Sequence, residues 1–140
     1  MNHIVMSLHR LVRELARAGD RILRDEVGLS YSRTLVLLAI DSEGAMSQQA
    51  LANWLGSTAP AVTGLLRELT ADGFVSVRPD ERNRRRNTVG LTAEGQRVIR
   101  LARGRLDERF RDLLRLAGVE EAPLQQSLTR IEAVMQGASD

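Results

Sequence analysis

The sequence predicts a mainly α-helical fold with one small β-hairpin, and three observations support this. Two short helical patterns separated by a glycine lie between residues 47 and 69. They are followed by a segment with the two-residue period of a β-strand, and each end of the chain carries a long apolar pattern of helical period. The 140 residues suffice for one compact subunit that buries roughly two thirds of its unfolded surface.

The two short helices are predicted at residues 47–55 and 57–69, in a helix-turn-helix arrangement. Ser47 is a side chain that can cap the first helix, and Gly56 can end it because glycine tolerates a positive φ. Ser57 is the predicted cap of the second helix, and Pro60 is tolerated in the first turn. The second helix has an apolar stripe of Val62, Leu65, Leu66 and Leu69.

The opposite face of the second helix carries mostly small side chains, with one arginine. These residues are Ser57, Thr58, Ala61, Thr63, Gly64 and Arg67. Such a face lets a helix backbone approach base edges in a major groove. This pattern favours a recognition helix over a purely structural one.

A basic turn separates two predicted strands, one containing Val75 and Val77 and the other running from about Asn87 to Leu91. Residues 78–86 contain five arginines against two acids, a local balance of +3 on a chain whose total is +2. Arginine at a hairpin tip can neutralise phosphates or enter a narrow minor groove. The segment therefore predicts a winged helix-turn-helix that binds double-stranded DNA.

Several motifs, in this order and spacing, resemble the MarR family of bacterial transcriptional regulators. They are Ser47-Gln48-Gln49-Ala50-Leu51-Ala52, Pro60-Ala61-Val62-Thr63, Asp72-Gly73-Phe74-Val75 and Leu91-Thr92-Ala93-Glu94-Gly95. The resemblance covers most of the chain. It implies a homodimer, and a small-molecule pocket bordered by the first helix and by a core helix that follows Ser30 or Ser32.

The wing departs from the family pattern at one position. The family usually has Asp-x-Arg nine and seven residues before the exit threonine, where this chain has Asn83 and Arg85. Asn83 can accept a hydrogen bond but supplies no charge to hold an arginine. The sequence Asp80-Glu81-Arg82 repeats the pattern three residues upstream, so Arg82 and Arg85 both remain candidates for minor-groove insertion, and the distance to Thr92 favours Arg85.

The predicted DNA contacts fall into three groups. Bases and nearby backbone are expected to meet Ser57, Thr58, Pro60, Ala61, Thr63, Gly64 and Arg67 of the second helix. Phosphate is expected at the start of the first helix, at Ser47, Gln48 and Gln49. The wing is expected to contribute Arg84, Arg85 and Arg86, with Arg82 as the alternative inserting residue.

The terminal segments are predicted to be dimerisation helices. The first stripe consists of Ile4, Leu8, Leu11, Leu15, Ala18 and Ile22. The second consists of Val98, Leu101, Leu106, Phe110, Leu113 and Leu114, and after a turn near Gly118 of Leu124, Leu128, Ile131 and Met135. Apolar stripes at both ends need cover, which a two-fold dimer supplies. The expected division is 1–28 for the amino-terminal dimerisation helix, 29–92 for the DNA-binding lobe and 93–140 for the carboxy-terminal dimerisation helices.

Other functions find little support in the composition. The two histidines, His3 and His9, do not share a helical face, so we expect no metal site. Both lie within the first nine residues, which leaves little material for a histidine-based catalytic triad, and we expect no cofactor. The absence of cysteine excludes disulfides and thiolate ligands. No apolar run approaches the roughly 20 residues of a membrane span, and we expect a cytoplasmic, non-enzymatic protein.

Two aromatic residues and an arginine series have ordinary structural interpretations. Trp54 could pack against the hairpin or lie near a phosphate, but we predict a core or partly buried residue. Tyr31 is a candidate polar contact in the pocket, but we predict an aromatic residue that is partly buried at a helix start. The arginines between 97 and 115 are predicted to form a solvated or salt-bridged helix face.

The sequence thus predicts a homodimeric transcriptional regulator, a repressor more than an activator, on a pseudo-palindromic operator with half-sites about 10 base pairs apart. A small-molecule effector would release it. Two alternatives remain: an architectural DNA-binding protein without an effector, and a winged-helix protein-interaction module.

Overall fold

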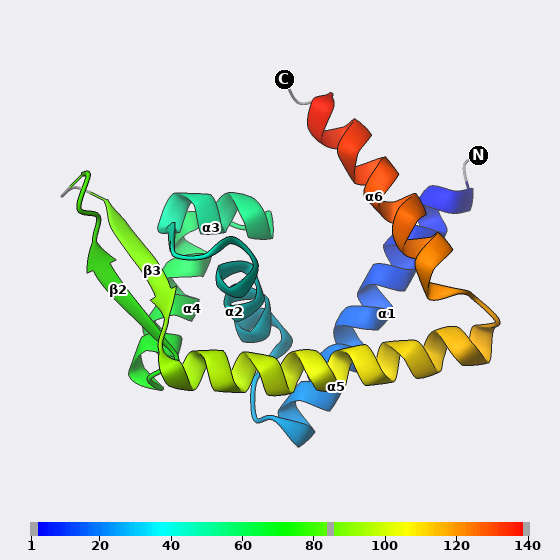
Figure 1. Cartoon of the computed structure of the whole chain (residues 1–140), viewed down its shortest axis with the longest axis horizontal. Coiled ribbons are helices and arrows are strands. Elements are labelled where there is room, and N and C mark those ends of the chain that lie inside the picture. Colours follow the sequence, from blue (N-terminus) through cyan, green and yellow to red (C-terminus); the bar gives the residue numbers. More distant parts are fainter. Residues whose placement is uncertain (1–2, 84–85, 139–140) are drawn as a thin grey trace. The chain divides into compact units, whose positions relative to one another are not determined.

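The computed structural model describes residues 3–83 and 86–138, and it forms two compact units. The first unit spans residues 1–105 and the second residues 106–140. In chain order (Figure 1) the elements are α1 (His3–Glu26), α2 (Tyr31–Glu43), β1 (Met46–Ser47), α3 (Gln48–Leu55), α4 (Ala59–Ala71), β2 (Val75–Pro79), β3 (Asn87–Leu91), α5 (Ala93–Ala117) and α6 (Glu121–Gly137). The predicted mainly α-helical fold with a small hairpin wing is confirmed.

Helix α2 is the centre of the first unit, because it packs against α1, α3, α4 and β3. Its Val36 and Leu37 are fully buried, as the predicted core helix requires. Of the two possible caps, Ser30 is the one used, since its side chain accepts a hydrogen bond from the backbone N–H of Arg33. Tyr31 is half-buried at the helix start, which confirms that prediction.

The two predicted strands form an antiparallel hairpin, but the sheet has a third strand that the sequence did not indicate. The strand order is β1-β3-β2, with Met46 opposite Val89 and Val77 on the other side of the same Val89. Strand β1 is only two residues long, too short for an alternating pattern. It ties the start of the helix-turn-helix to the base of the wing.

The terminal helices form as predicted. Helix α1 has 24 residues, α5 has 25 and α6 has 17, and Gly118 turns the chain between α5 and α6 with a φ of 70°. None of the helices within the described residues is long and apolar enough to cross a membrane.

The Leu-Thr-x-x-Gly motif at the exit of the wing is a hydrogen-bonded junction. The Thr92 hydroxyl donates to the carbonyl of Gly73 at 2.6 Å and accepts from the N–H of Gly95 at 3.0 Å. The backbone N–H of Thr92 donates to the carbonyl of Phe74 at 3.1 Å. One threonine therefore caps α5 and fixes it to the turn between α4 and β2.

The glycine of this motif is required by close packing. A Cβ atom at Gly95 would overlap the backbone carbonyl oxygen of Phe74, whereas a Cβ at Gly104, further along α5, has nothing within 4 Å. We expect Gly95→Ala to lower the free energy of unfolding by about 2–3 kcal/mol. Gly104→Ala should raise it by about 0.5–1 kcal/mol, because alanine is the better helix former.

Urea denaturation followed by circular dichroism measures both variants. Equal stability of Gly95→Ala and the unmodified protein would contradict the close approach of α5 to Phe74.

Candidate nucleic-acid interface

Helices α3 and α4 are joined by a tight turn that sets the geometry of the helix-turn-helix. The predicted cap at Ser47 is confirmed, because its Oγ accepts from the N–H of Ala50 at 3.1 Å. Gly56 ends α3 in the left-handed region with a φ of 62° and a ψ of 35°, which confirms its predicted role. Only Ser57 and Thr58 then separate Gly56 from α4.

The predicted cap of the second helix was wrong by one residue. Thr58, and not Ser57, is the N-cap of α4, and its Oγ1 accepts from the N–H of Ala61 at 3.4 Å. With this register Pro60 is the second helical residue, in the turn where its missing N–H costs nothing. Helix α4 also continues to Ala71, two residues beyond the predicted end.

Helix α4 has one buried apolar face and one exposed face, as the sequence predicted. Val62, Leu66 and Leu69 are buried and Leu65 is half-buried. The exposed residues at the helix start and along its outer face are Ser57, Thr58, Pro60, Ala61, Thr63, Gly64 and Arg67. Apart from Arg67 these side chains are short, so a binding partner can come close to the α4 backbone.

The residues at the start of α3 are partly engaged within the helix. Ser47 uses its oxygen as a cap acceptor, which leaves its hydroxyl proton available to an external acceptor. Gln48 is half-buried, and the exposed Gln49 donates from Nε2 to Asn53 Oδ1 at 3.1 Å. The interpretation of Trp54 as a core or subcore residue was wrong, because Trp54 is 45% exposed on α3.

Asp80 makes two hydrogen bonds at the end of strand β2 of the wing. Its backbone N–H donates to the carbonyl of Arg86 at 2.8 Å, and its carboxylate accepts from the backbone N–H of Arg82 at 3.0 Å. Asp80 thus shapes the loop of the wing through the backbone of Arg82. The predicted contacts Arg84 and Arg85 lie outside the described residues.

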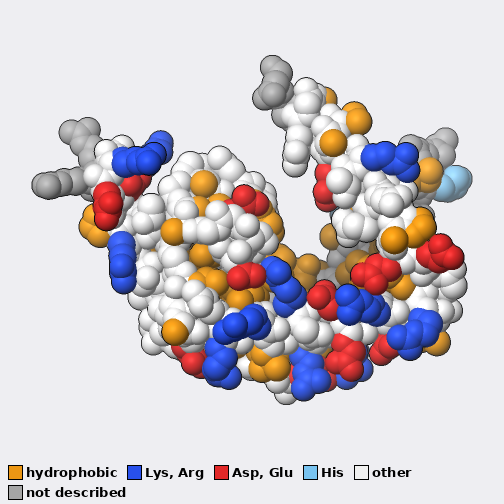
Figure 2. All heavy atoms as spheres, in the orientation of Figure 1, with side chains coloured by type: hydrophobic (Ala, Val, Ile, Leu, Met, Phe, Trp, Pro, Cys, Tyr) orange, Lys and Arg blue, Asp and Glu red, His pale blue; other side chains and the backbone are white. Residues whose placement is uncertain are grey.

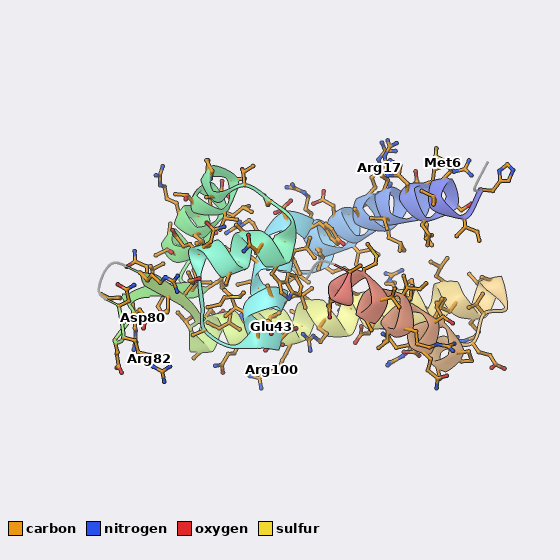
Figure 3. All side chains as sticks on the ribbon, turned by 90° about the horizontal axis from the view of Figure 1, so that it is seen from above. Met6, Arg17, Glu43, Asp80, Arg82 and Arg100 are labelled. Carbon is orange, nitrogen blue, oxygen red and sulfur yellow. The ribbon has the colours of Figure 1, made fainter. Side chains whose placement is uncertain are left out.

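The hairpin carries its charged residues away from the helices. Asp80 and Arg82 lie at its far end in Figure 3, and basic and acidic side chains meet there in Figure 2. Arg82 and Arg86 are exposed. Because residues 78–86 hold five arginines and two acids, this segment has an excess of positive charge, and strand β2, which leads into it, packs against α4.

A shallow pocket of about 410 Å³ lies in the first unit behind the base of the wing. Its lining includes Asp41 at the end of α2, Gly90 of β3, and Gln96 and Arg100 of α5. Asp41 is paired with Arg103 at 2.9 Å. None of the pocket-lining residues belongs to α1, so this pocket differs from the one that the family resemblance implied between α1 and the core helix.

Together, the helix pair, the three-stranded sheet and the basic hairpin define a winged helix-turn-helix protein. Residues 29–86, from the start of α2 to the tip of the wing, match the model of the MarR family. Over this segment the chain matches the MarR family of transcriptional regulators.

The similar proteins are regulators as well. The transcriptional activatory protein BadR of Rhodopseudomonas palustris is 33% identical over 100 residues, which make up 69% of this chain and 57% of BadR. The chain therefore spans little more than half the length of that relative.

Two solved structures have the same fold. The transcriptional regulator BldR from Sulfolobus solfataricus has a TM-score of 0.83 at 26% identity, covering 94% of this chain and 93% of its own. A MarR-family regulator from Rhodococcus sp. RHA1 also has a TM-score of 0.83, at 22% identity, covering 95% and 92%.

Proposed function

We propose that this protein is a homodimeric transcriptional regulator that binds a pseudo-palindromic DNA operator and is released by a small molecule. The observation that carries the proposal is the packing of the small-surfaced α4 against strand β2 of the arginine-rich wing. In this scheme residues 1–28 and 93–140 dimerise, and residues 29–92 bind DNA.

The proposed binding mode assigns different contacts to α4 and to the wing. Helix α4 enters the major groove, where the exposed Thr63, Gly64 and Arg67 face base edges or nearby backbone. Arg67 makes no ion pair within the described residues, so its charge is available to phosphate or guanine. The wing arginines contact phosphate or the adjacent minor groove, and Ser47, Gln48 and Gln49 contact phosphate at the start of α3.

Selection from a pool of random duplexes tests this function directly. We expect a palindromic consensus with half-sites about 10 base pairs apart. An architectural DNA-binding protein would yield no consensus and only a steep salt dependence. A protein-interaction module would select no duplex at all.

The wing variants test which arginine enters the groove. On the selected duplex we expect Arg85→Ala to weaken binding by about tenfold or more and to reduce the salt slope by about one, with a smaller loss for Arg82→Ala. Arg115→Ala removes the same charge from the second unit and should leave binding unchanged. If Arg82→Ala caused the larger loss, the assignment to Arg85 would be reversed.

The exposed apolar side chains of the terminal helices support a homodimer. On α1, Ile4, Leu11 and Val12 are 50–69% exposed. On α6, Ile131 and Val134 are 53% and 72% exposed. Apolar surface of this extent on two long helices is typical of an association surface, and a two-fold partner would cover it.

Substitutions on α6 test the dimer. Ile131→Glu places a charge on the exposed apolar face, where the isolated subunit can accommodate it but an apolar interface cannot. We expect a monomer in light scattering at micromolar concentration, with operator affinity reduced by at least about tenfold because the two half-sites are no longer bound together. Gln126→Glu adds the same charge to an exposed position of α6 and should remain dimeric, and a dimeric Ile131→Glu would contradict this interface.

Repression follows if the operator overlaps the promoter, because the bound dimer then blocks transcription. Activation is the second candidate, favoured by the name of the relative BadR as an activatory protein. Transcription in vitro from a promoter carrying the selected operator distinguishes the two outcomes by the direction of the change.

The pocket behind the wing is our candidate effector site. Because Asp41 is paired with Arg103 and Arg100 makes no ion pair within the described residues, the pocket has one uncompensated cation beside the apolar Ile40 and Leu91. This lining suits a small amphipathic anion. A ligand there would release DNA through its different affinity for the bound and free conformations.

A matched probe series tests this site. Hexanoate should lower operator affinity in a titration, whereas the neutral hexanamide should have little effect. Arg100→Gln should abolish the hexanoate response while leaving operator affinity without ligand unchanged, and Arg97→Gln, on the same helix outside the pocket, should respond normally. An undiminished hexanoate response in Arg100→Gln would exclude this pocket.

A further inference from the structure

Arg33, in the first turn of α2, is the feature that the DNA-binding scheme above leaves unused. Its side chain is 18% exposed, whereas two other ion-paired arginines, Arg103 and Arg115, are 45% and 77% exposed. Removing a guanidinium from water costs free energy unless acidic partners compensate it. The acidic groups around Arg33 therefore show which parts of the fold its charge connects.

Both acidic partners of Arg33 belong to the end of α4. Nη2 of Arg33 pairs with Oδ2 of Asp72, the C-cap residue of α4, and Nε lies 4.0 Å from Oε2 of Glu68. Nε is buried and makes no hydrogen bond. The largely buried charge is thus balanced by two carboxylates of α4 that lie one turn apart.

The first turn of α2 is also fixed on its other side. The backbone N–H of Tyr31 donates to Oδ1 of Asp20 on α1 at 2.9 Å. This hydrogen bond, together with that from Arg24, holds the pKa of Asp20 below its usual range. Within α2, the hydroxyl of the buried Thr34 donates to the carbonyl of Ser30 at 2.9 Å. One ordered turn therefore contacts both α1 and the end of α4.

We propose that Arg33 is a positioning residue that latches the carboxyl end of the recognition helix α4, through Asp72 and Glu68, to the first turn of α2. This inference rests on the proposed DNA binding. In a dimer formed through α1, the latch would define where α4 stands relative to the partner's α4, which is the spacing that two major grooves must match.

The latch and simple electrostatics predict opposite changes in DNA affinity for the substitution Asp72→Asn. Asp72→Asn removes a negative charge from the DNA-binding lobe, so electrostatics alone predicts tighter binding to the polyanion. If Asp72 holds α4 through Arg33, the same substitution releases the helix end and leaves a buried guanidinium undercompensated. Operator binding then becomes weaker.

The experiment measures affinities for the selected operator and for a scrambled duplex at fixed salt. We expect Asp72→Asn to weaken operator binding by about tenfold and scrambled-duplex binding by much less, because positioning affects base readout more than phosphate contact. Glu43→Gln is the matched control. It removes one charge from the exposed end of α2 in the same lobe and should leave operator binding unchanged or up to about twofold tighter.

A double-mutant cycle assigns the effect to the pair. If Arg33→Gln folds, adding Asp72→Asn to it should cost little further affinity, because the two residues act together. If Arg33→Gln does not fold, Asp72→Asn decides the question alone, since Asp72 is half-exposed at a helix end. Operator binding by Asp72→Asn that equals or exceeds that of the unmodified protein would overturn the latch, whereas failure of the unmodified protein to bind any duplex would overturn the proposed function instead.

Discussion

The burial of α2 is the interaction on which the rest of the first unit depends. Val36 and Leu37 have no exposed surface and Ile40 has almost none. Each such side chain contributes about 1.5–3 kcal/mol through removal from water. Because α2 packs against α1, α3, α4 and β3, the same apolar contacts supply a common platform for the helix-turn-helix and for the sheet. Helix α4, whose outer face carries small side chains and Arg67, is oriented by the buried contacts of its apolar face with this platform.

Around this platform, single polar side chains fix more than one element at once. Ser47 ends β1 and caps α3, and Thr92 caps α5 while bonding the turn that follows α4. These bonds lie where backbone groups at helix ends would otherwise lack partners. Together with the pairing of β1 and β3, they join the helix-turn-helix to the base of the wing and so complement the apolar contacts of α2.

Local patterns allowed most of the fold and the outline of the site to be predicted. The cap at Ser47, the left-handed Gly56 and the hairpin follow from residue type and period, which act over a few residues. Strand β1 and the exposure of Trp54 could not be predicted this way, because pairing with β3 and burial depend on residues distant in sequence. Arg33 shows the same limit, since its partner Asp72 is 39 residues away. The shift of the cap from Ser57 to Thr58 reflects two adjacent capping residues of similar propensity.

The distribution of charge supports the wing as the proposed DNA-binding surface of this nearly neutral chain. The chain has 20 basic and 18 acidic residues, and several of these charges form ion pairs along the helices. Arg97 donates to both carboxylate oxygens of Glu94 and lowers its pKa, and Arg24 pairs with Asp20, one turn earlier in α1. Exposed pairs of this kind add little stability, with a median of about 0–1 kcal/mol. Within each pair the two opposite charges largely cancel at a distance. The excess positive charge of residues 78–86 is not cancelled in this way, so its field extends to about one Debye length. The latch at Arg33 extends this logic to α4, where an inward-facing cation offsets the two acids nearest the end of the recognition helix.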